Sequence, residues 1–235
     1  MARSREVNAD TGRTARAAVF EEYDEKIAAT DLRRYLAKGP RPWTRALTGA
    51  LKAEGIEGAT LLNIGGGIGA IQHELLEGGL TQATHVDASS AYLEAARMEG
   101  ERRGHGDRVT YRHGDFVDLA GSVSPADIVT LERVLNVYPE WERLAALSAK
   151  RARRLYAVAL PRDTPFVRLV ISAMNRVLRL QRRRVRAAII PIEVLDRVLR
   201  DEGLVRHRSA TVGPAWQVVV YRRTAHKTES TVDSL

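Results

Sequence analysis

A cluster of glycines follows a short apolar run and could bind an anionic group through the backbone. Residues 61–64 have the length of a buried strand, and apolar side chains recur at helical spacing across residues 71–76. The cluster between them consists of Gly65, Gly66, Gly67 and Gly69. Glycine permits a tight turn and leaves N–H groups at the helix start open to a carboxylate or phosphate. Alone, the motif is equally typical of a glycine-rich turn in any α/β protein.

Two aspartates follow the next two predicted strands, where a nucleoside would need hydrogen-bond acceptors. Asp87 lies at the end of the second strand, and its carboxylate could accept from both hydroxyls of a ribose. Asp115 follows the third and could accept from the exocyclic amine of adenine, with the N–H of Phe116 available to a ring nitrogen. Either aspartate could instead cap a helix or begin a turn. The three features in this order favour an adenosine site.

The elements that position these residues alternate along the chain. Strand-like runs cover residues 61–64, 85–89, 109–112, 128–131 and 155–160, and helices are predicted at 91–104 and 141–153. Such alternation predicts a parallel sheet with helices on both faces. Ligands bind beyond the carboxyl ends of strands in such sheets, so the glycine loop and both aspartates would share one edge. Two later runs, 205–211 and 216–221, predict a hairpin turning through Gly213 and Pro214.

From about residue 23 to residue 222 the chain resembles the class I S-adenosylmethionine-dependent methyltransferases. The family's first motif is an acidic residue followed by x-Gly-x-Gly-x-Gly, and residues 63–69 are NIGGGIG. The resemblance implies an α/β, Rossmann-like sheet of seven strands, mostly parallel with an antiparallel C-terminal hairpin and helices on both faces. It also implies S-adenosyl-L-methionine as the cofactor and S-adenosyl-L-homocysteine as the product.

The family's residue roles carry over to matching positions of this chain. The resemblance places the methionyl group on the loop glycines, the ribose on Asp87, the adenine against Ala88 and its amine on Asp115. Asn63 stands where the family has an acid, so we expect cofactor binding to be weaker by about 1 kcal/mol for a partly exposed contact. The expected cofactor-binding residues are Tyr23, Asn63, Gly65, Gly66, Gly67, Gly69, Asp87, Ala88, Asp115, Phe116 and Glu132.

Residues near the ends of the fourth and fifth strands are candidates for the methyl-acceptor site. The catalytic candidates are Glu132 and Tyr138, together with Tyr23, which would close over the cofactor; each could equally be a packing or surface residue. Other polar candidates are Arg133, Asn136 and Arg162. His113 could act as a base, although a structural role is favoured. No carboxylate cluster follows the fourth strand, so no divalent metal is expected.

The order of segments predicts five parts. They are a helical cap (1–55), a cofactor-binding core (56–160), a basic amphipathic lid helix (161–190), a C-terminal helix and hairpin (191–223) and a disordered tail (224–235). The layout resembles magnesium-protoporphyrin O-methyltransferases and related bacterial enzymes. That resemblance rests on the helix at residues 23–24, the loop at 138–139, the turn at 161–164 and the long helix beyond it. These motifs are too weak to identify the substrate.

Positive charge is concentrated in the C-terminal part. Residues 1–140 hold 17 Lys or Arg against 21 Asp or Glu, whereas residues 141–235 hold 20 against 8. Within the latter, the predicted helix 164–186 has an apolar stripe flanked by arginines. It could be a lid over a flat or greasy acceptor, a contact with a membrane surface, or ordinary packing with a solvated rim. Nucleic acid is disfavoured, because aromatic content is low and no RNA-binding module is recognisable.

Composition limits the remaining possibilities. The 235 residues can bury one sizeable core, and the absence of cysteine excludes disulfides and thiolate metal sites. Neither a signal-peptide pattern nor a long apolar stretch is present, so a soluble cytoplasmic protein is expected. The predicted function is metal-independent O- or N-methylation of a small molecule. An NAD-binding protein without methyl transfer stays an alternative, because Gly65-x-Gly67-x-x-Ala70 also matches the dinucleotide fingerprint. An RNA-directed methyltransferase is a second alternative. The oligomeric state is left open.

Overall fold

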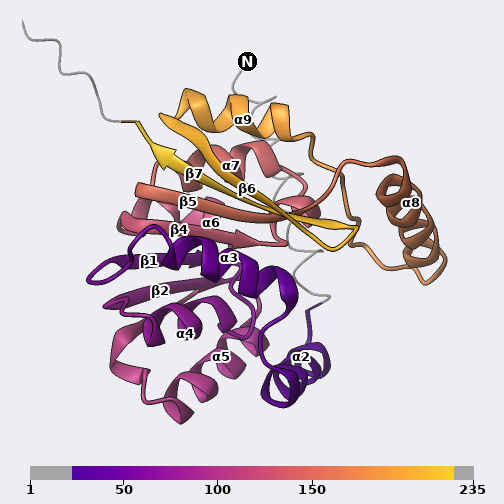
Figure 1. The fold of residues 1–235 in the computed structure, drawn as a ribbon. Helices are drawn as coiled ribbons and strands as arrows, with labels where there is room; N and C mark the ends of the chain where they lie inside the picture. The colour runs from indigo at the N-terminus through magenta and orange to yellow at the C-terminus, as the bar shows by residue number, and fades with distance from the viewer. Residues whose placement is uncertain (1–22, 225–235) are drawn as a thin grey trace, which may run out of the picture.

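Short, mostly apolar runs of the sequence form a single mixed sheet, shown in Figure 1 of a computed structural model that describes residues 23–224. The strands are β1 (Thr60–Ile64), β2 (Gln82–Asp87), β3 (Val109–His113), β4 (Ala126–Glu132), β5 (Ala152–Pro161), β6 (Leu204–Val212) and β7 (Trp216–Arg223). Their order is β3-β2-β1-β4-β5-β7-β6. Strands β1 to β5 pair in parallel, and β7 runs antiparallel to both β5 and β6. The predicted fold class is confirmed.

Helices cover both faces of this sheet. The helices of the described residues are α2 (Glu25–Lys38), α3 (Pro42–Lys52), α4 (Ala70–Glu77), α5 (Ser90–Arg102), α6 (Phe116–Leu119), α7 (Trp141–Ala149), α8 (Pro165–Leu180) and α9 (Ile192–Asp201), and of these α8 lies away from the sheet. Several begin where a side chain caps the first turn: Asp24 accepts from the N–H of Ile27, and Ser89 from that of Tyr92. The cap at Ser89 lies just before the helix predicted over residues 91–104.

Side chains of successive strand residues point to opposite faces of the sheet, so neighbouring residues pack into two separate cores. Leu62 faces the core under α6, α7 and α9, whereas Leu61 faces the core under α3 and α4. Because the central strands β1, β4 and β5 are buried on both sides, their sequences are mostly apolar runs. The carboxyl ends of β1 to β4 are thereby held rigidly at one edge of the sheet.

The largest differences from the predicted boundaries are at the ends of two helices. The helix expected over residues 164–186 ends at Leu180, because Arg182 takes a left-handed conformation (φ 58°) and the N–H of Arg183 donates to the carbonyl of Leu178. Residues 181–191, which connect α8 to α9, are called the returning segment here, and the last four of the predicted helix's arginines lie in it. Helix α7 ends at Ala149 rather than 153, since pairing of β5 with β4 begins at Ala152. The segment after β3 contains the short helix α6.

Predictions for residues 1–22 and 225–235 lie outside the described part of the chain. The proposed division into five parts also stays a prediction. Between residues 23 and 224, none of the helices combines the length and hydrophobicity needed to cross a membrane.

Candidate functional site

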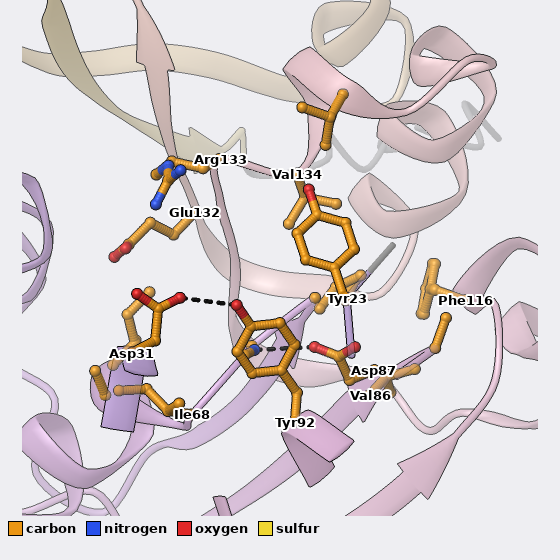
Figure 2. Close-up of a pocket in the computed structure, with 18 of the residues that line it drawn as sticks. Tyr23, Asp31, Ile68, Val86, Asp87, Tyr92, Phe116, Glu132, Arg133 and Val134 are labelled. Atoms are coloured by element: carbon orange, nitrogen blue, oxygen red, sulfur yellow. Dashed lines mark hydrogen bonds between the residues drawn. The ribbon is translucent and has the colours of Figure 1, made fainter. Parts of the chain in front are cut away.

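A cavity of about 290 Å³ lies at the carboxyl edge of the sheet (Figure 2). Its walls come from the glycine loop after β1, the ends of β2, β3 and β4, and the helices α2 and α3. The volume is close to the lower end of small-molecule sites, and the position is where open α/β sheets bind ligands. The predicted residues that line it are Tyr23, Gly65, Gly66, Gly67, Asp87, Ala88, Asp115, Phe116, Glu132, Arg133 and Tyr138.

The glycine loop owes its path to backbone conformations that other residues rarely adopt. Gly65 and Gly67 have φ angles of 59° and 55°. A Cβ atom at Gly65 would lie 2.5 Å from the side chain of Val134. The N–H groups of both glycines are used within the protein, by the carbonyl of Val86 at 2.8 Å and the Asp87 carboxylate at 2.9 Å. The loop therefore offers a ligand close approach to its backbone, but not these two donors.

Asp87 is held at the end of β2 with its carboxylate facing the cavity (Figure 2). Its two oxygens accept hydrogen bonds from the N–H groups of Gly67 and Ser89, each at 2.9 Å. Burial raises the pKa of Asp87. Within residues 23–224 the only basic side chain within 4.0 Å is His85, whose own pKa burial lowers to about 3. Asp87 is thus a desolvated acid that no Lys or Arg among these residues contacts, and the attraction of His113 only partly offsets the effect of burial on its pKa.

Asp115 both caps a helix and lines the cavity. One oxygen accepts from the N–H of Val117 at 3.0 Å, beginning α6, and the hydroxyl of Tyr138 donates to the carboxylate at 2.8 and 2.9 Å. Tyr138 is therefore a positioning residue for Asp115 in this arrangement, and its catalytic role stays a prediction. The capping alternative and the ligand-binding alternative for Asp115 are compatible, because a carboxylate has about four lone-pair sites.

Glu132 has an unsatisfied oxygen at the end of β4. Its Oε1 accepts from the indole N–H of Trp43 and the hydroxyl of Thr44, both at 3.0 Å. Its Oε2 is buried and, among the described residues, has no hydrogen-bond partner. Burial raises the pKa of Glu132. A buried acidic oxygen on a cavity wall is costly unless a ligand satisfies it.

The sequence analysis missed a wall contributed by α2 and α3. Asp31 accepts from the Tyr92 hydroxyl at 2.8 Å and pairs with Arg41 at 3.1 Å, and all three residues line the cavity. Arg34 and Thr44 lie on the same wall. The available signal was spacing: positions 27, 31 and 34 are separated by four and three residues, so they share one face of the helix.

Five predicted residues do not reach the cavity. The Asn63 side chain is fully buried, donating to Gln72 at 3.3 Å and accepting from the Thr130 hydroxyl at 2.9 Å, so we no longer expect it to contact a ligand there. Gly69 caps the start of α4. His113 contacts the carbonyl of Ala88 at 3.1 Å, which supports a structural role. The other two are Asn136, buried beside the returning segment after α8, and Arg162, at the β7 turn.

Tyr23 and Arg133 both line the cavity (Figure 2). The ring of Tyr23 lies 5.9 Å from that of Tyr92. The guanidinium of Arg133 lies 5.4 Å from the ring of Trp43 and 5.6 Å from that of Trp216, within cation–π range. No group of three His, Asp or Glu side chains is placed to hold a metal ion in the described part of the chain.

Comparison with known proteins agrees with this architecture. Residues 61–156 match a family model for a methyltransferase domain. No curated protein matches the sequence. Among solved structures, a magnesium protoporphyrin IX methyltransferase from Synechocystis PCC 6803 with bound SAH (S-adenosylhomocysteine) is similar with a TM-score of 0.70 and 16% identity, covering 89% of this chain and 100% of that one.

Two further structures extend the comparison. An O-methyltransferase family protein from Burkholderia thailandensis has a TM-score of 0.66 and 16% identity, covering 88% of this chain and 62% of that one. A putative methyltransferase from Haloferax volcanii, solved with the activator Trm112, has a TM-score of 0.65 and 15% identity, covering 88% and 98%. Residues 61–156 thus match a methyltransferase domain, and the described chain shares its seven-stranded fold with solved methyltransferases, one of them with bound SAH.

Proposed function

We propose that the protein transfers a methyl group from S-adenosylmethionine to an oxygen or nitrogen of a small-molecule acceptor. The observation that carries the proposal is the meeting of Gly67, Asp87 and Asp115 in one cavity. These residues come from three strand ends that the sheet order places next to one another. Structural similarity to a magnesium protoporphyrin IX methyltransferase supports a small-molecule acceptor.

The adenosyl half fits the wall formed by β2 and β3. The Asp87 carboxylate would accept hydrogen bonds from both ribose hydroxyls. These bonds would stabilise its charged form, which burial disfavours. Ala88 and Phe116 line the cavity beside it and would contact the adenine. Asp115, fixed by Tyr138, would accept from the adenine amine.

The amino-acid half fits the opposite wall, where both signs of charge are present. The free Oε2 of Glu132 would accept from the α-ammonium group. Arg34 and Arg41 line the same wall and carry the charge that a carboxylate requires. This assignment gives the cationic group a partner other than Asn63, which points into the core.

The reaction asks little of the protein beyond alignment and exclusion of water. Bound S-adenosylmethionine supplies an activated methyl group for in-line displacement. Holding the acceptor in line can contribute roughly 7–11 kcal/mol in favourable cases. An acidic hydroxyl or a carboxylate needs little base, and an alcohol or amide would need one. Tyr23, which lines the cavity, is our candidate for closing the site over both ligands.

The test is calorimetric titration with S-adenosylhomocysteine and, separately, with NAD. We expect binding of the first only, and loss of that binding in Asp87→Asn. The matched control is Asp107→Asn, on the 3-10 turn before β3 and outside the cavity. Binding of NAD alone would contradict the proposal. Incubating host extract with methyl-labelled cofactor, followed by mass spectrometry, would then identify the acceptor, and label found only in RNA would overturn the small-molecule class.

A further inference from the structure

We propose that α8 attaches the protein to the surface of a bilayer that contains anionic lipids. The inference does not depend on the proposed function, because it rests on the outer surface of this helix. In Figure 1, α8 projects from the body of the protein, apart from the helices that cover the sheet. Of its 16 residues only Val167 is buried.

The apolar stripe of α8 is uncovered in the described structure. Leu169 is 69% exposed and Leu180 is 80% exposed, far more than a core helix would allow. Six large apolar side chains share this face: Phe166, Leu169, Val170, Met174, Val177 and Leu180. Positions 166, 170, 173, 177 and 180 are separated by three or four residues and therefore form one continuous stripe. Contiguous exposed apolar surface of this kind marks an interaction site.

The charge beside the stripe defines the partner. Residues 164–188 contain seven arginines and no Asp, Glu or Lys. Arg168 pairs with Asp163, which lies just before the helix. Arg176 and Arg179 are exposed on the polar face that borders the stripe. Each basic residue near an anionic membrane surface contributes about 1 kcal/mol of attraction.

The attachment of α8 to the body is firm enough to transmit binding. The side-chain amide of Asn175 binds the backbone N–H and carbonyl of Ala187 at 3.0 and 2.8 Å. The N–H of Ala188 donates to the carbonyl of Asn136 at 2.6 Å. The helix and its returning segment therefore form one unit that is hydrogen-bonded to the loop after β4.

Other occupants fit less well. A second copy of the chain would bring two arginine-rich helices together, and like charges at such a contact oppose association. A nucleic acid would satisfy the arginines but leave the apolar stripe in water. A helix of 16 residues is about 24 Å long, too short and too charged to span a bilayer, but suited to lie within its interface.

Docking through α8 would turn the cavity edge of the sheet toward the membrane. Helix α8 begins four residues after β5 ends, at the same carboxyl edge where β1 to β4 border the cavity. Figure 1 shows α8 and α2 extending from this edge of the sheet. The proposed surface and the cavity are therefore on one side of the molecule.

The test is co-sedimentation of the full chain with vesicles, without cofactor. One vesicle set is phosphatidylcholine, and the other is an equimolar mixture of phosphatidylcholine and phosphatidylglycerol. We expect binding to the mixed vesicles that weakens with salt. The double variant Leu169→Gln/Val177→Gln and the double variant Arg176→Gln/Arg179→Gln should each bind roughly tenfold more weakly.

Matched controls separate the stripe from general surface effects. Met98→Gln changes a half-exposed residue of α5, and Arg143→Gln changes an exposed arginine of α7, so both should bind like wild type. No binding to mixed vesicles, or equal binding of all variants, would overturn the proposal. So would a dimer in light scattering that Leu169→Gln/Val177→Gln dissociates, or tighter binding to RNA than to vesicles at physiological salt. Circular dichroism checks that each variant is folded.

Discussion

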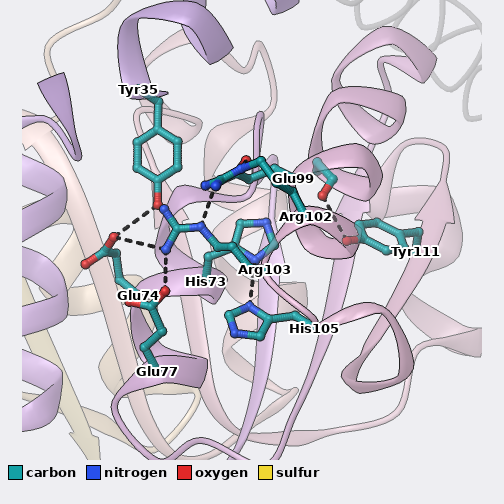
Figure 3. Close-up of polar contacts among 10 residues, drawn as sticks. Tyr35, His73, Glu74, Glu77, Glu99, Arg102, Arg103, His105 and Tyr111 are labelled. Carbon is teal, nitrogen blue, oxygen red and sulfur yellow. Dashed lines mark hydrogen bonds and ion pairs between the residues drawn. The ribbon is translucent and has the colours of Figure 1, made fainter. Parts of the chain in front are cut away.

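The cavity and a polar network behind it hold buried acidic side chains in opposite electrostatic surroundings. We call the second region the Arg103 network; Figure 3 shows its residues Tyr35, His73, Glu74, Glu77, Glu99, Arg102, Arg103, His105 and Tyr111. Glu99 accepts from Arg103 at 2.6 Å and from Arg102 at 2.7 Å, and these bonds lower its pKa to about 2 despite its burial. In the cavity, burial raises the pKa of Asp87 and of Glu132.

This difference in surroundings distinguishes the structural acid Glu99 from Asp87 and Glu132, the acids that we propose bind a ligand. Glu99 is 2% exposed and Asp87 is 9% exposed, so burial alone does not distinguish them. What differs is compensation: Arg103 also contacts Glu77 at 2.5 Å and Glu74 at 3.9 Å, so each acid of the network has an arginine partner within the fold. A buried acid left without a counter-charge costs stability, and such sites are where ligands bind.

Removing the cavity acid should give the largest effect, and it should fall on binding. Asp87→Asn removes the charge that accepts two ribose hydroxyls, and hydrogen bonds to a charged group contribute about 1.5–3 kcal/mol each. We expect the Kd for S-adenosylhomocysteine to rise by ~100-fold or more. Urea unfolding of the free protein should change little, because relief from burial offsets the weakened backbone hydrogen bonds. An unchanged Kd in Asp87→Asn would show that Asp87 does not bind the ligand, and would remove the proposed difference between the cavity and the Arg103 network.

Acid should weaken the protein through the network's histidine. Burial lowers the pKa of His73 from 6.5 to about 4. Between pH 6.5 and pH 4 the His73 imidazole is therefore protonated in the unfolded chain but neutral in the folded chain. Stability is therefore lost as pH falls from 6.5 to 4, by about 3 kcal/mol. Asp87 and Glu132 act in the opposite sense, since their raised pKa values favour folding in acid. Urea unfolding at pH 7 and pH 4 measures the loss, and His73→Gln should lose less than wild type.

Neutralising the network acid should reduce stability and leave binding unchanged. Glu99→Gln removes the partner of Arg103 and should lower the free energy of unfolding by about 2 kcal/mol at pH 7. That contribution is present above the ordinary Glu pKa and is lost as pH falls toward 2, so the wild type and the variant should converge in strong acid. Weaker S-adenosylhomocysteine binding in this variant, at a temperature where it is folded, would contradict the separation.

The smallest effect is expected at Asn63, which adjoins the cavity in sequence but behaves like a structural residue. Asn63→Asp would bring a charge beside the Gln72 carbonyl oxygen, now a hydrogen-bond acceptor of the Asn63 amide. We expect a loss of about 1 kcal/mol or more in unfolding free energy and no tighter binding of S-adenosylhomocysteine. Tighter binding measured by calorimetry would instead return Asn63 to the cofactor site.

The parts of the site that sequence could predict are those encoded by local rules. Glycine conformations, strand lengths and the ends of β2 and β3 follow from residue type and spacing, and they located Gly67, Asp87 and Asp115. The direction in which the Asn63 side chain points could not be predicted. Strand β1 is buried on both sides, so no alternation of polar and apolar residues marks which side chain faces α4.

Contacts between distant segments were also beyond the sequence. The bond from Tyr138 to Asp115 depends on how the loop after β4 packs against α6, and no residue pattern sets that geometry. The wall from α2 and α3 depends on where two helices dock on the finished sheet. For α8, periodicity predicted an apolar face but not its surroundings: no α8 residue lines the cavity, so its role as a lid stays a prediction.

The stacking of Trp43 on Trp216 ties the beginning of the chain to its last strand. Their rings lie 4.8 Å apart, although 173 residues separate them in the sequence. Nearby, Glu54 at the end of the same helical region contacts Arg208 at 2.6 Å and His207 at 3.1 Å. During synthesis α3 leaves the ribosome long before β6 and β7 exist, so its final support is missing until the hairpin has been made. A nascent or truncated chain that lacks the hairpin would therefore be without the ring against which Trp43 packs, and Trp43 is the residue whose indole N–H donates to Glu132.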